Sequence, residues 1–215
     1  MELLHQDEHL LVVVKPAGLD AEHQVPAALA EQTGLPVSQI RCVHRLDRGV
    51  GGVMVYAKTA QAAAELSRQV ADRTMEKEYL AVVRGLPDPA EGSMEDFLYH
   101  DARRNKTFVV SRARRGVKLA SLDYQVLGCR QTDLGPQSLV RIDLHTGRPH
   151  QIRVQFASRT WPLVGDGRYG GGSGEIALWA RRLRFAHPVT GAPLAFASSP
   201  PMALPWGQFP EAYGM

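Results

Sequence analysis

The sequence feature that most constrains the fold is a glycine-rich loop that leads straight into a short apolar segment. The loop ends with Gly49–Gly52 and the apolar segment is Val53–Ala57, which has the length and the bounding residues of a buried strand. The same loop carries Asp47 between Arg45 and Arg48. A neighbouring positive charge favours the ionised form of a carboxylate, so Asp47 is a candidate nucleophile. The alternative is a surface turn with an ordinary ion pair.

Other short apolar runs bounded by turn residues predict a strand-rich chain. Leu10–Val14 stops at a Lys-Pro-Ala-Gly turn, and Tyr79–Val83 stops at Gly85. Alternation in the run Ser138–His145 puts Val140, Ile142 and Leu144 on the face toward the core. Further strands are expected at Phe108–Val110, Ser121–Leu127, Ser138–His145, Ile176–Ala186 and Leu194–Ala197.

Three segments are expected to be helical. Pro26–Gln32 is rich in alanine and ends near Gly34. Thr59 is a candidate N-cap for a helix that runs to about Thr74. Pro149 is placed to open a third helix, from Pro149 to Ala157. Because the sequence has no repeat, no linker and no second composition regime, we expect one domain over residues 1–215.

Composition excludes several classes of protein. With 44% apolar and 22% charged residues, the chain is expected to be a soluble globular protein rather than a disordered one. The N-terminus lacks the basic start and apolar core of a signal peptide, and no apolar run is long enough to cross a bilayer. Cys42 and Cys129 are far apart in the sequence, so neither a disulfide nor a zinc site is indicated. We therefore expect a cytoplasmic protein.

The basic residues favour an acidic partner. The sequence pI is about 9.0 and most of the basic residues are arginine, whose planar fork suits phosphate. An arginine bias in the coding sequence is an equally good explanation. A cluster between residues 103 and 118, interrupted by an apolar run, has the composition of an arm that follows an RNA or DNA backbone, or of a solvated loop. Its members are Arg103, Arg104, Lys106, Arg112, Arg114, Arg115 and Lys118.

Several single residues allow two interpretations each. Lys15 is either a phosphate contact or a cation that stabilises its own turn. Tyr79, at the start of a strand, projects into a cleft or belongs to the core. Arg153 shares a helix face with His150 and either reaches Asp47 or lies exposed to solvent.

Six blocks of the sequence, taken in order, closely resemble the RluA-type pseudouridine synthases. Each block alone is a weak signal, but the ordered set spans nearly the whole chain. The blocks are Val14–Gly18, His44–Asp47, Lys77–Gly85, Thr146–Arg153, Gly165–Gly170 and Phe185–Gly191.

The resemblance implies a fold and a reaction. The fold is α+β, with a curved, mixed, mostly antiparallel sheet flanked by helices and a central RNA-binding cleft. The reaction isomerises specific uridines in ribosomal or transfer RNA to pseudouridine, without a metal or an organic cofactor. RNA is the expected partner. We expect a monomer with no obligate protein partner and without the small S4-like RNA-binding domain that some relatives carry at the N-terminus.

The resemblance also implies roles for individual residues. Asp47 is the nucleophile, Tyr79 packs on the target base, and Arg153 pairs with Asp47. Arg45 helps to hold the RNA open after the uridine has left the stack. The remaining expected pocket and RNA contacts are His44, Lys77, Gln151, Ile152, Lys15, Arg103 and Arg104.

One departure from the family pattern stands just after the acid. Relatives usually continue with Thr-Ser-Gly, where this chain has Val50-Gly51-Gly52. The missing hydroxyls are expected to loosen the loop without removing the chemistry, since a local hydrogen bond contributes about 1 kcal/mol. They are also the sequence support for an alternative, an RNA-binding protein of the same fold without catalysis. A metal-dependent hydrolase that uses His44, His145 and His150 is a third hypothesis, but no carboxylate-bearing metal motif accompanies these histidines.

Overall fold

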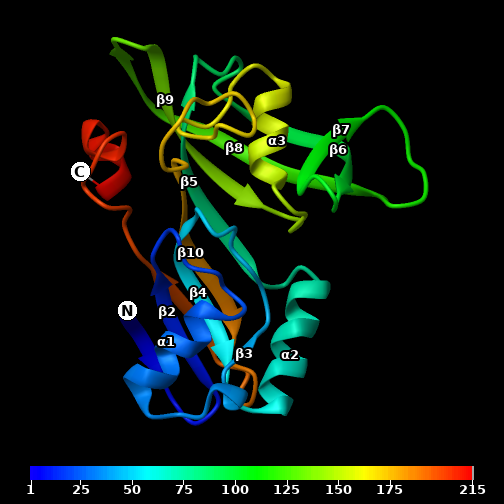
Figure 1. The fold of residues 1–215 in the computed structure, drawn as a ribbon, viewed down its shortest axis with the longest axis vertical. Coiled ribbons are helices and arrows are strands. Elements are labelled where there is room, and N and C mark those ends of the chain that lie inside the picture. The colour runs from blue at the N-terminus through cyan, green and yellow to red at the C-terminus, as the bar shows by residue number, and fades with distance from the viewer. Residues whose placement is uncertain (215) are drawn as a thin grey trace. The chain divides into compact units, whose positions relative to one another are not determined.

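The computed structural model describes residues 1–214, which form two compact units. Unit 1 contains Met1–Lys77 and Trp179–Ser199, and unit 2 contains Glu78–Leu178 and the segment from Pro200 onward. The chain passes from unit 1 to unit 2 inside one strand, β5 (Glu76–Arg84). Each unit combines strands with helices (Figure 1), so the predicted α+β class is confirmed. The expectation of one domain over the whole chain stays a prediction.

Unit 1 is built on a mixed sheet in the order β1-β2-β4-β10-β11, with the short β3 (Arg41–Cys42) paired to β4. The strands pair antiparallel except for β4 and β10, which run parallel, with Trp179 opposite Gly51 and Ala180 opposite Gly52. All predicted strands of this unit are present, and β1 is a strand that the sequence did not predict. The bounds of the strands are β1 Glu2–Gln6, β2 Leu10–Lys15, β4 Gly51–Ala57, β10 Leu178–Ala186 and β11 Pro193–Ala197.

Two helices accompany this sheet. In α2 (Ala60–Ala71) the N-cap is Thr59, as predicted, and its hydroxyl accepts a hydrogen bond from the Ala62 amide at 3.1 Å. Ala62 and Leu66 of this helix pack in one core cluster with alternate residues of β2 and β4, such as Val12 and Val55. Tyr56 points to the other face of β4 and donates to the carbonyl of Ala21, just before α1 (Gln24–Thr33). The glycine that ends α1, Gly34, is left-handed, as its C′ position requires.

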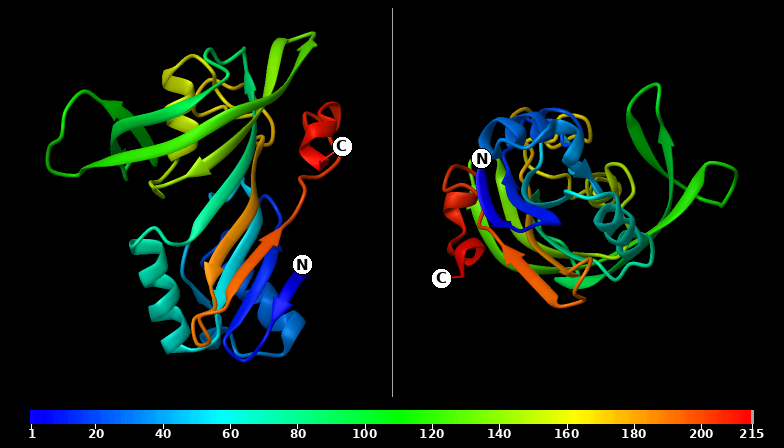
Figure 2. Two further views of the ribbon diagram at one scale, coloured as in Figure 1. Left: turned by 180° about the vertical axis from the view of Figure 1, so that it is seen from behind. Right: turned by 90° about the horizontal axis from the view of Figure 1, so that it is seen from below.

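Unit 2 is an antiparallel sheet in the order β5-β9-β8-β6-β7. The helix α3 (Gln151–Ser158) packs on β6 and β7 (Figure 2), with Val154 against Leu98 and Ala120. The bounds of the strands are β6 Glu91–Asp101, β7 Lys106–Val110, β8 Val117–Thr132 and β9 Gly135–Leu144. Short 3-10 turns lie at Val37–Gln39 in unit 1 and at Trp206–Gln208 and Pro210–Tyr213 in unit 2.

The structure corrects three expectations for unit 2. The strand β6 is absent from the sequence prediction, because only Met94 and Leu98 of its residues are buried and the apolar signal is weak. Leu144 is only half-buried, whereas Leu139 on the other face of β9 is fully buried, because both faces of this strand are covered near its centre. The third helix begins at Gln151, not at Pro149, because the intervening His150 is left-handed with φ of 53°.

No helix among residues 1–214 is long and apolar enough to cross a bilayer. Cys42 and Cys129 are free thiols in this structure.

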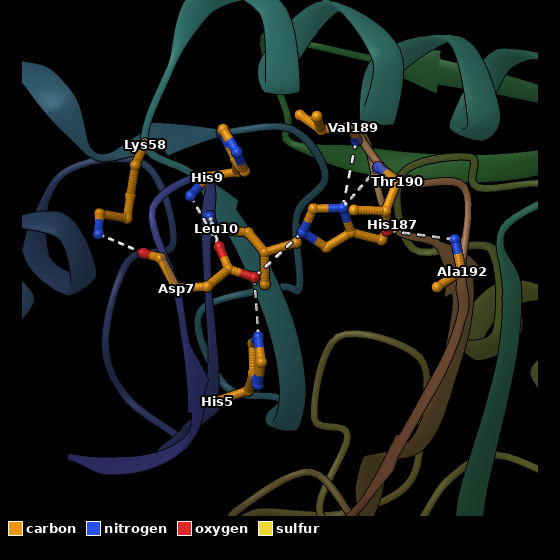
Figure 3. Close-up of polar contacts among 9 residues, drawn as sticks. All are labelled: His5, Asp7, His9, Leu10, Lys58, His187, Val189, Thr190 and Ala192. Atoms are coloured by element: carbon orange, nitrogen blue, oxygen red, sulfur yellow. Dashed lines mark hydrogen bonds and ion pairs between the residues drawn. The ribbon is translucent and has the colours of Figure 1, made fainter.

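A polar cluster in unit 1 joins the β1–β2 turn to the β10–β11 turn (Figure 3). Oδ1 of Asp7 accepts from the amides of His9 and Leu10 at 2.7 and 2.9 Å, and Oδ2 lies 2.9 Å from His5 Nε2 and 3.1 Å from His187 Nε2. On the other side of the His187 ring, Nδ1 accepts from the amides of Val189 and Thr190. Because Nδ1 accepts, the proton is on Nε2, and the ring donates to Asp7. The block His187–Gly191 therefore has a structural role, and we call the cluster of His5, Asp7 and His187 the clasp.

The clasp predicts a pH-dependent contribution to stability. Burial raises the pKa of Asp7, but the hydrogen bonds from His5, His9, Leu10 and His187 outweigh it and hold the pKa well below its ordinary value of 3.8. A carboxylate with a lowered folded-state pKa stabilises the fold above its unfolded pKa, and this contribution is lost as the pH falls below about 4.

We predict that Asp7→Asn lowers the free energy of unfolding by about 1–3 kcal/mol at neutral pH, because the amide turns a donor toward the fixed N–H of His187. Urea unfolding across a pH series measures this, with the exposed neighbour change Glu8→Gln as the control. The difference between wild type and Asp7→Asn should shrink in acid. Equal stability of the two proteins at neutral pH would contradict the clasp.

Candidate active site

The buried ammonium group of Lys15 holds the loop that carries Asp47 through hydrogen bonds to backbone carbonyls. Lys15, at the end of β2, is fully buried, and its Nζ donates to the carbonyls of Pro16, Leu19 and Arg48 at 2.9, 2.8 and 3.2 Å. The Gly18 amide donates to the same Arg48 carbonyl at 2.7 Å. The turn after β2 and the residue next to Asp47 are thus held by one cation.

Burial lowers the pKa of Lys15 to about 8, and the attraction of Asp20 and Asp47 partly opposes this. The ammonium therefore lies close enough to Asp47 for the two charges to interact. Its contacts favour the interpretation of Lys15 as a loop-stabilising cation over that of a phosphate contact, because all three acceptors are backbone carbonyls.

The two arginines beside Asp47 make contacts with other residues. Arg45 is exposed and pairs with Glu22 at 3.0 Å, an exposed ion pair that contributes little to stability and exchanges easily. Arg48 donates from Nε to the Gly18 carbonyl at 2.8 Å. The Val50 amide donates to the carbonyl of half-buried Asp47 at 2.9 Å and closes a turn after it.

His44 anchors the loop to the neighbouring strand. Its buried Nε2 accepts a hydrogen bond from the Val55 amide at 3.1 Å, and burial, with a smaller effect of Lys77, lowers the pKa of this imidazole to about 3. His44 is neutral at physiological pH. Burial also lowers the pKa of Lys77 and raises that of Cys42 to about 11, so Cys42 is a thiol that donates to the His44 carbonyl. The predicted RNA contacts of His44 and Lys77 stay predictions.

The departure at Val50-Gly51-Gly52 has a structural explanation. A Cβ on Gly51 would lie 2.3 Å from Cζ3 of Trp179, and a Cβ on Gly52 would lie 2.2 Å from the Ala180 carbonyl oxygen. The indole of Trp179 fills the space above Gly51, and its Nε1 donates to Ser198. The loop is therefore packed against β10 at these two glycines, and the expected loosening stays a prediction.

The other predicted catalytic residues lie in unit 2. Tyr79 on β5 is buried and stands opposite Ile142 of β9. Arg153 on α3 is buried and forms a bidentate pair with Asp166, Nε to Oδ2 at 2.7 Å and Nη2 to Oδ1 at 2.9 Å. Sequence reasoning did not identify Asp166 as a partner, although it lies in the Gly165–Gly170 block. The pairing of Arg153 with Asp47 stays a prediction, and the Asp166 contact is compatible with it because a guanidinium carries five N–H groups.

Gln151 shapes the turn before α3. Its side chain is buried, its Oε1 accepts from the Thr146 hydroxyl and the Arg148 amide, and its Nε2 donates to the Ser121 carbonyl. Ile152, the next residue, is also buried. The hydrogen bonds of Gln151 fix the turn, and the predicted place of both residues in a pocket stays a prediction.

The basic cluster lies on the β6–β7–β8 portion of unit 2, which we call the basic arm (residues 101–118). Arg103 and Arg104 are exposed in the turn between β6 and β7. Lys106 lies 5.4 Å from the ring centre of Tyr169, and Arg114 lies 5.5 Å from that of Tyr99. The arm therefore combines a strand framework with exposed cations at its turns.

The histidines of the metal hypothesis have other partners. His145 Nε2 lies 2.8 Å from Asp123, and His150 Nδ1 lies 3.0 Å from the Tyr169 hydroxyl. Within the described part of the chain, no group of three or more His, Cys, Asp or Glu side chains is placed to hold a metal ion.

The comparisons with known proteins agree on one family. A family model described as RNA pseudouridylate synthase matches residues 9–158. The uncharacterized RNA pseudouridine synthase YhcT of Bacillus subtilis is 33% identical over 88% of this chain and 65% of its own length, so the chain spans just under two thirds of that relative. The dual-specificity RNA pseudouridine synthase RluA of Escherichia coli is 34% identical over 90% of both chains. The ribosomal large subunit pseudouridine synthase D of Pseudomonas aeruginosa is 33% identical over 96% of this chain and 70% of its own.

Two solved structures share the fold. Human RNA pseudouridylate synthase domain containing 1 has a TM-score of 0.80 at 24% identity and covers 95% of this chain and 84% of its own. Human RNA pseudouridylate synthase domain containing 4 has a TM-score of 0.75 at 24% identity and covers 93% and 88%.

The packing of Gly51 against Trp179 predicts that the family's serine is not tolerated here. Gly51→Ser should lower the free energy of unfolding by about 1–3 kcal/mol, because the new Cβ overlaps the indole. Trp179→Leu should remove the overlap, so that the double variant loses less than the sum of the single losses. Urea unfolding measures both. Gly92→Ser is the control, since a Cβ at this position would meet atoms no closer than 3.5 Å. A Gly51→Ser protein as stable as wild type would show that the indole of Trp179 does not exclude a side chain at position 51.

Proposed function

Because the chain belongs to the RNA pseudouridylate synthase family, we propose that it isomerises specific uridines of ribosomal RNA, transfer RNA or both to pseudouridine. The matching family model and the similar relatives confirm the resemblance found in the sequence. The observation that carries the proposal is that the matched range, residues 9–158, contains Asp47, Tyr79 and Arg153 together. Further support comes from the buried anchors on both sides of Asp47, since a nucleophile must be held in place to act.

The proposed chemistry moves one bond and exchanges two protons. The bond from ribose C1′ to uracil N1 breaks and a bond from C1′ to C5 forms, while the C5 proton is lost to solvent and N1 gains a proton. Asp47 starts the reaction by attacking either C6 of the base or C1′ of the sugar, and both routes need its carboxylate. The bond from Asp47 to C6 breaks again after C1′ has joined C5, or the bond from Asp47 to C1′ is displaced when C5 attacks C1′, so the free carboxylate is restored. Arg153 pairs with that carboxylate, and the ring of Tyr79 stacks on the freed base.

The proposed substrate is a uridine flipped out of its RNA. Flipping requires a few kcal/mol of unstacking, of which stacking on an aromatic ring returns about 1–3 kcal/mol. Arg45, whose present partner is only an exposed glutamate, is proposed to support the opened RNA. Cations of the basic arm, Arg103 and Arg104 first, are proposed to contact the backbone. We further infer a cytoplasmic monomer that needs neither a metal, an organic cofactor nor an obligate protein partner.

The function is tested with RNA labelled with tritium at uridine C5, prepared from cells that lack the gene. Each isomerisation releases one tritium to water, so released tritium counts turnovers. We predict release by wild type and none above background by Asp47→Asn, whose amide keeps the shape but is not a nucleophile. Asp72→Asn, an exposed carboxylate at the end of α2, should match wild type.

The outcomes separate two functions. RNA binding without tritium release by wild type would favour the alternative of a non-catalytic RNA-binding protein. Release by Asp47→Asn at the wild-type rate would overturn the role of Asp47.

The basic arm predicts a salt-dependent contribution to RNA binding. Each phosphate contact contributes about 0.7 to the slope of log K against log salt for single-stranded RNA. Arg103→Gln with Arg104→Gln should therefore weaken binding to all RNA sequences and reduce the magnitude of that slope by about 1.4, which is about 0.7 for each of the two lost contacts. Fluorescence anisotropy over a series of KCl concentrations measures it. The control is Arg68→Gln with Arg184→Gln, which removes the same charge from exposed ion pairs of unit 1 and should leave the slope unchanged. Equal slopes for the two double variants would contradict the role of the arm in RNA binding.

A further inference from the structure

The ion pair between Arg153 and Asp166 is almost completely buried, with 7% and 1% of the two side chains exposed. Removing two charges from water is unfavourable, and their attraction only roughly compensates, so such a pair is a weak source of stability. Its geometry is nevertheless well defined, since two parallel N–H···O bonds fix both the position and the plane of the guanidinium. A reason other than stability is therefore needed for placing this pair in the interior of unit 2.

The carboxylate is held on a rigid loop. The Asp166 amide donates to the Leu163 carbonyl at 3.1 Å, and the Asp166 carbonyl accepts from the amides of Tyr169 and Gly171 at 3.1 and 2.8 Å. The loop closes on itself through the Gly165 amide, which donates to the Gly171 carbonyl. A Cβ on Gly171 would lie 1.6 Å from the Leu163 oxygen, so the closure is tight enough to require glycine.

An aromatic ring supports the guanidinium from the side. The guanidinium carbon of Arg153 lies 5.2 Å from the ring centre of Tyr169, within the range of a cation–π contact. The ring is itself fixed, because its hydroxyl accepts from the Thr107 amide at 2.8 Å and lies 3.0 Å from His150 Nδ1. Asp166 and Tyr169 come from the same short loop, so one segment contacts the guanidinium through both an ion pair and an aromatic ring.

We propose that Asp166 is a positioning residue for pseudouridine formation, which fixes the position and the plane of the Arg153 guanidinium. The proposal rests on the proposed function, in which Arg153 is the counter-ion of Asp47. Asp166 acts only through Arg153. Because Nε and Nη2 of the guanidinium are bound to the carboxylate, the direction of its opposite edge is fixed.

The chain offers a control at the end of the same helix. Arg159, the C-cap of α3, pairs with Asp96 at 2.9 Å, and this pair is partly buried. Asp96→Asn and Asp166→Asn therefore make the same chemical change in two Arg–Asp pairs, one within α3 and one at its end. Only the pair of Arg153 with Asp166 includes a residue with a proposed role in the reaction.

The test compares four proteins in single-turnover tritium release with saturating enzyme: wild type, Asp166→Asn, Arg153→Met and the double variant. Asp166→Asn should slow the reaction about 10- to 100-fold, since misplacement of a catalytic group by about 1 Å has effects of this size. Its affinity for the same RNA, from filter binding, should stay within about twofold of wild type. In the double variant the Asn change should add almost nothing to the loss caused by Arg153→Met, because residues that act as one unit are not additive. Asp96→Asn should react at the wild-type rate.

Other results would overturn the proposal. A wild-type rate for folded Asp166→Asn, or losses that multiply in the double variant, would show that Asp166 does not act through Arg153. An equal slowing by Asp96→Asn would show a general effect of weakening α3. If thermal unfolding shows that Asp166→Asn is not folded, Asp166→Glu replaces it: this variant keeps the charge but moves the oxygens, and a wild-type rate for it would also refute the proposal.

The same assay distinguishes a failure of the role of Asp166 from a failure of the proposed function. If Asp47→Asn is inactive while Asp166→Asn reacts like wild type, only the role of Asp166 fails. If wild type releases no tritium, the proposed function itself fails.

Discussion

The buried ammonium of Lys15 is the interaction on which the arrangement around Asp47 depends. A fully buried cation is tolerated only where acceptors satisfy it, and here the three acceptors are the carbonyls of Pro16, Leu19 and Arg48. These carbonyls belong to two loops that are about thirty residues apart in the sequence, so one side chain sets the geometry of both. Removing the ammonium would take its hydrogen bonds from the Pro16 and Leu19 carbonyls and leave the Arg48 carbonyl with the Gly18 amide, so the loop next to the acid would be held less firmly.

Much of the fold follows from local sequence signals. The strands around Val53–Ala57 and Leu10–Val14 were predictable because β-branched runs bounded by glycine and proline are typical of β-strands. The cap at Thr59 and the stop at Gly34 were predictable for similar reasons. The strand β6 was not, because it buries only Met94 and Leu98 and its other side chains are at least partly exposed, which is the pattern of a loop as much as of a strand.

The candidate site was predictable only where the neighbouring residues in the sequence indicate a chemical role. Asp47 stands out because it lies between two arginines ahead of a buried strand. Its supports do not, since the contact of Gly51 with Trp179 joins residues more than a hundred positions apart and leaves no periodic signal. Asp166 lies near Arg153 in the sequence, but only the closure of the loop through Gly165 and Gly171 shows that the two side chains meet.

The central claim, that this chain makes pseudouridine in RNA through Asp47, is tested most directly by mapping pseudouridine across total RNA. Cells that lack the gene are supplied with either the wild-type chain or Asp47→Asn, and the two maps are compared. The account predicts at least one uridine that becomes pseudouridine with the wild-type chain and stays uridine with Asp47→Asn. Identical maps from the two cultures, with both proteins present at equal levels, would contradict it.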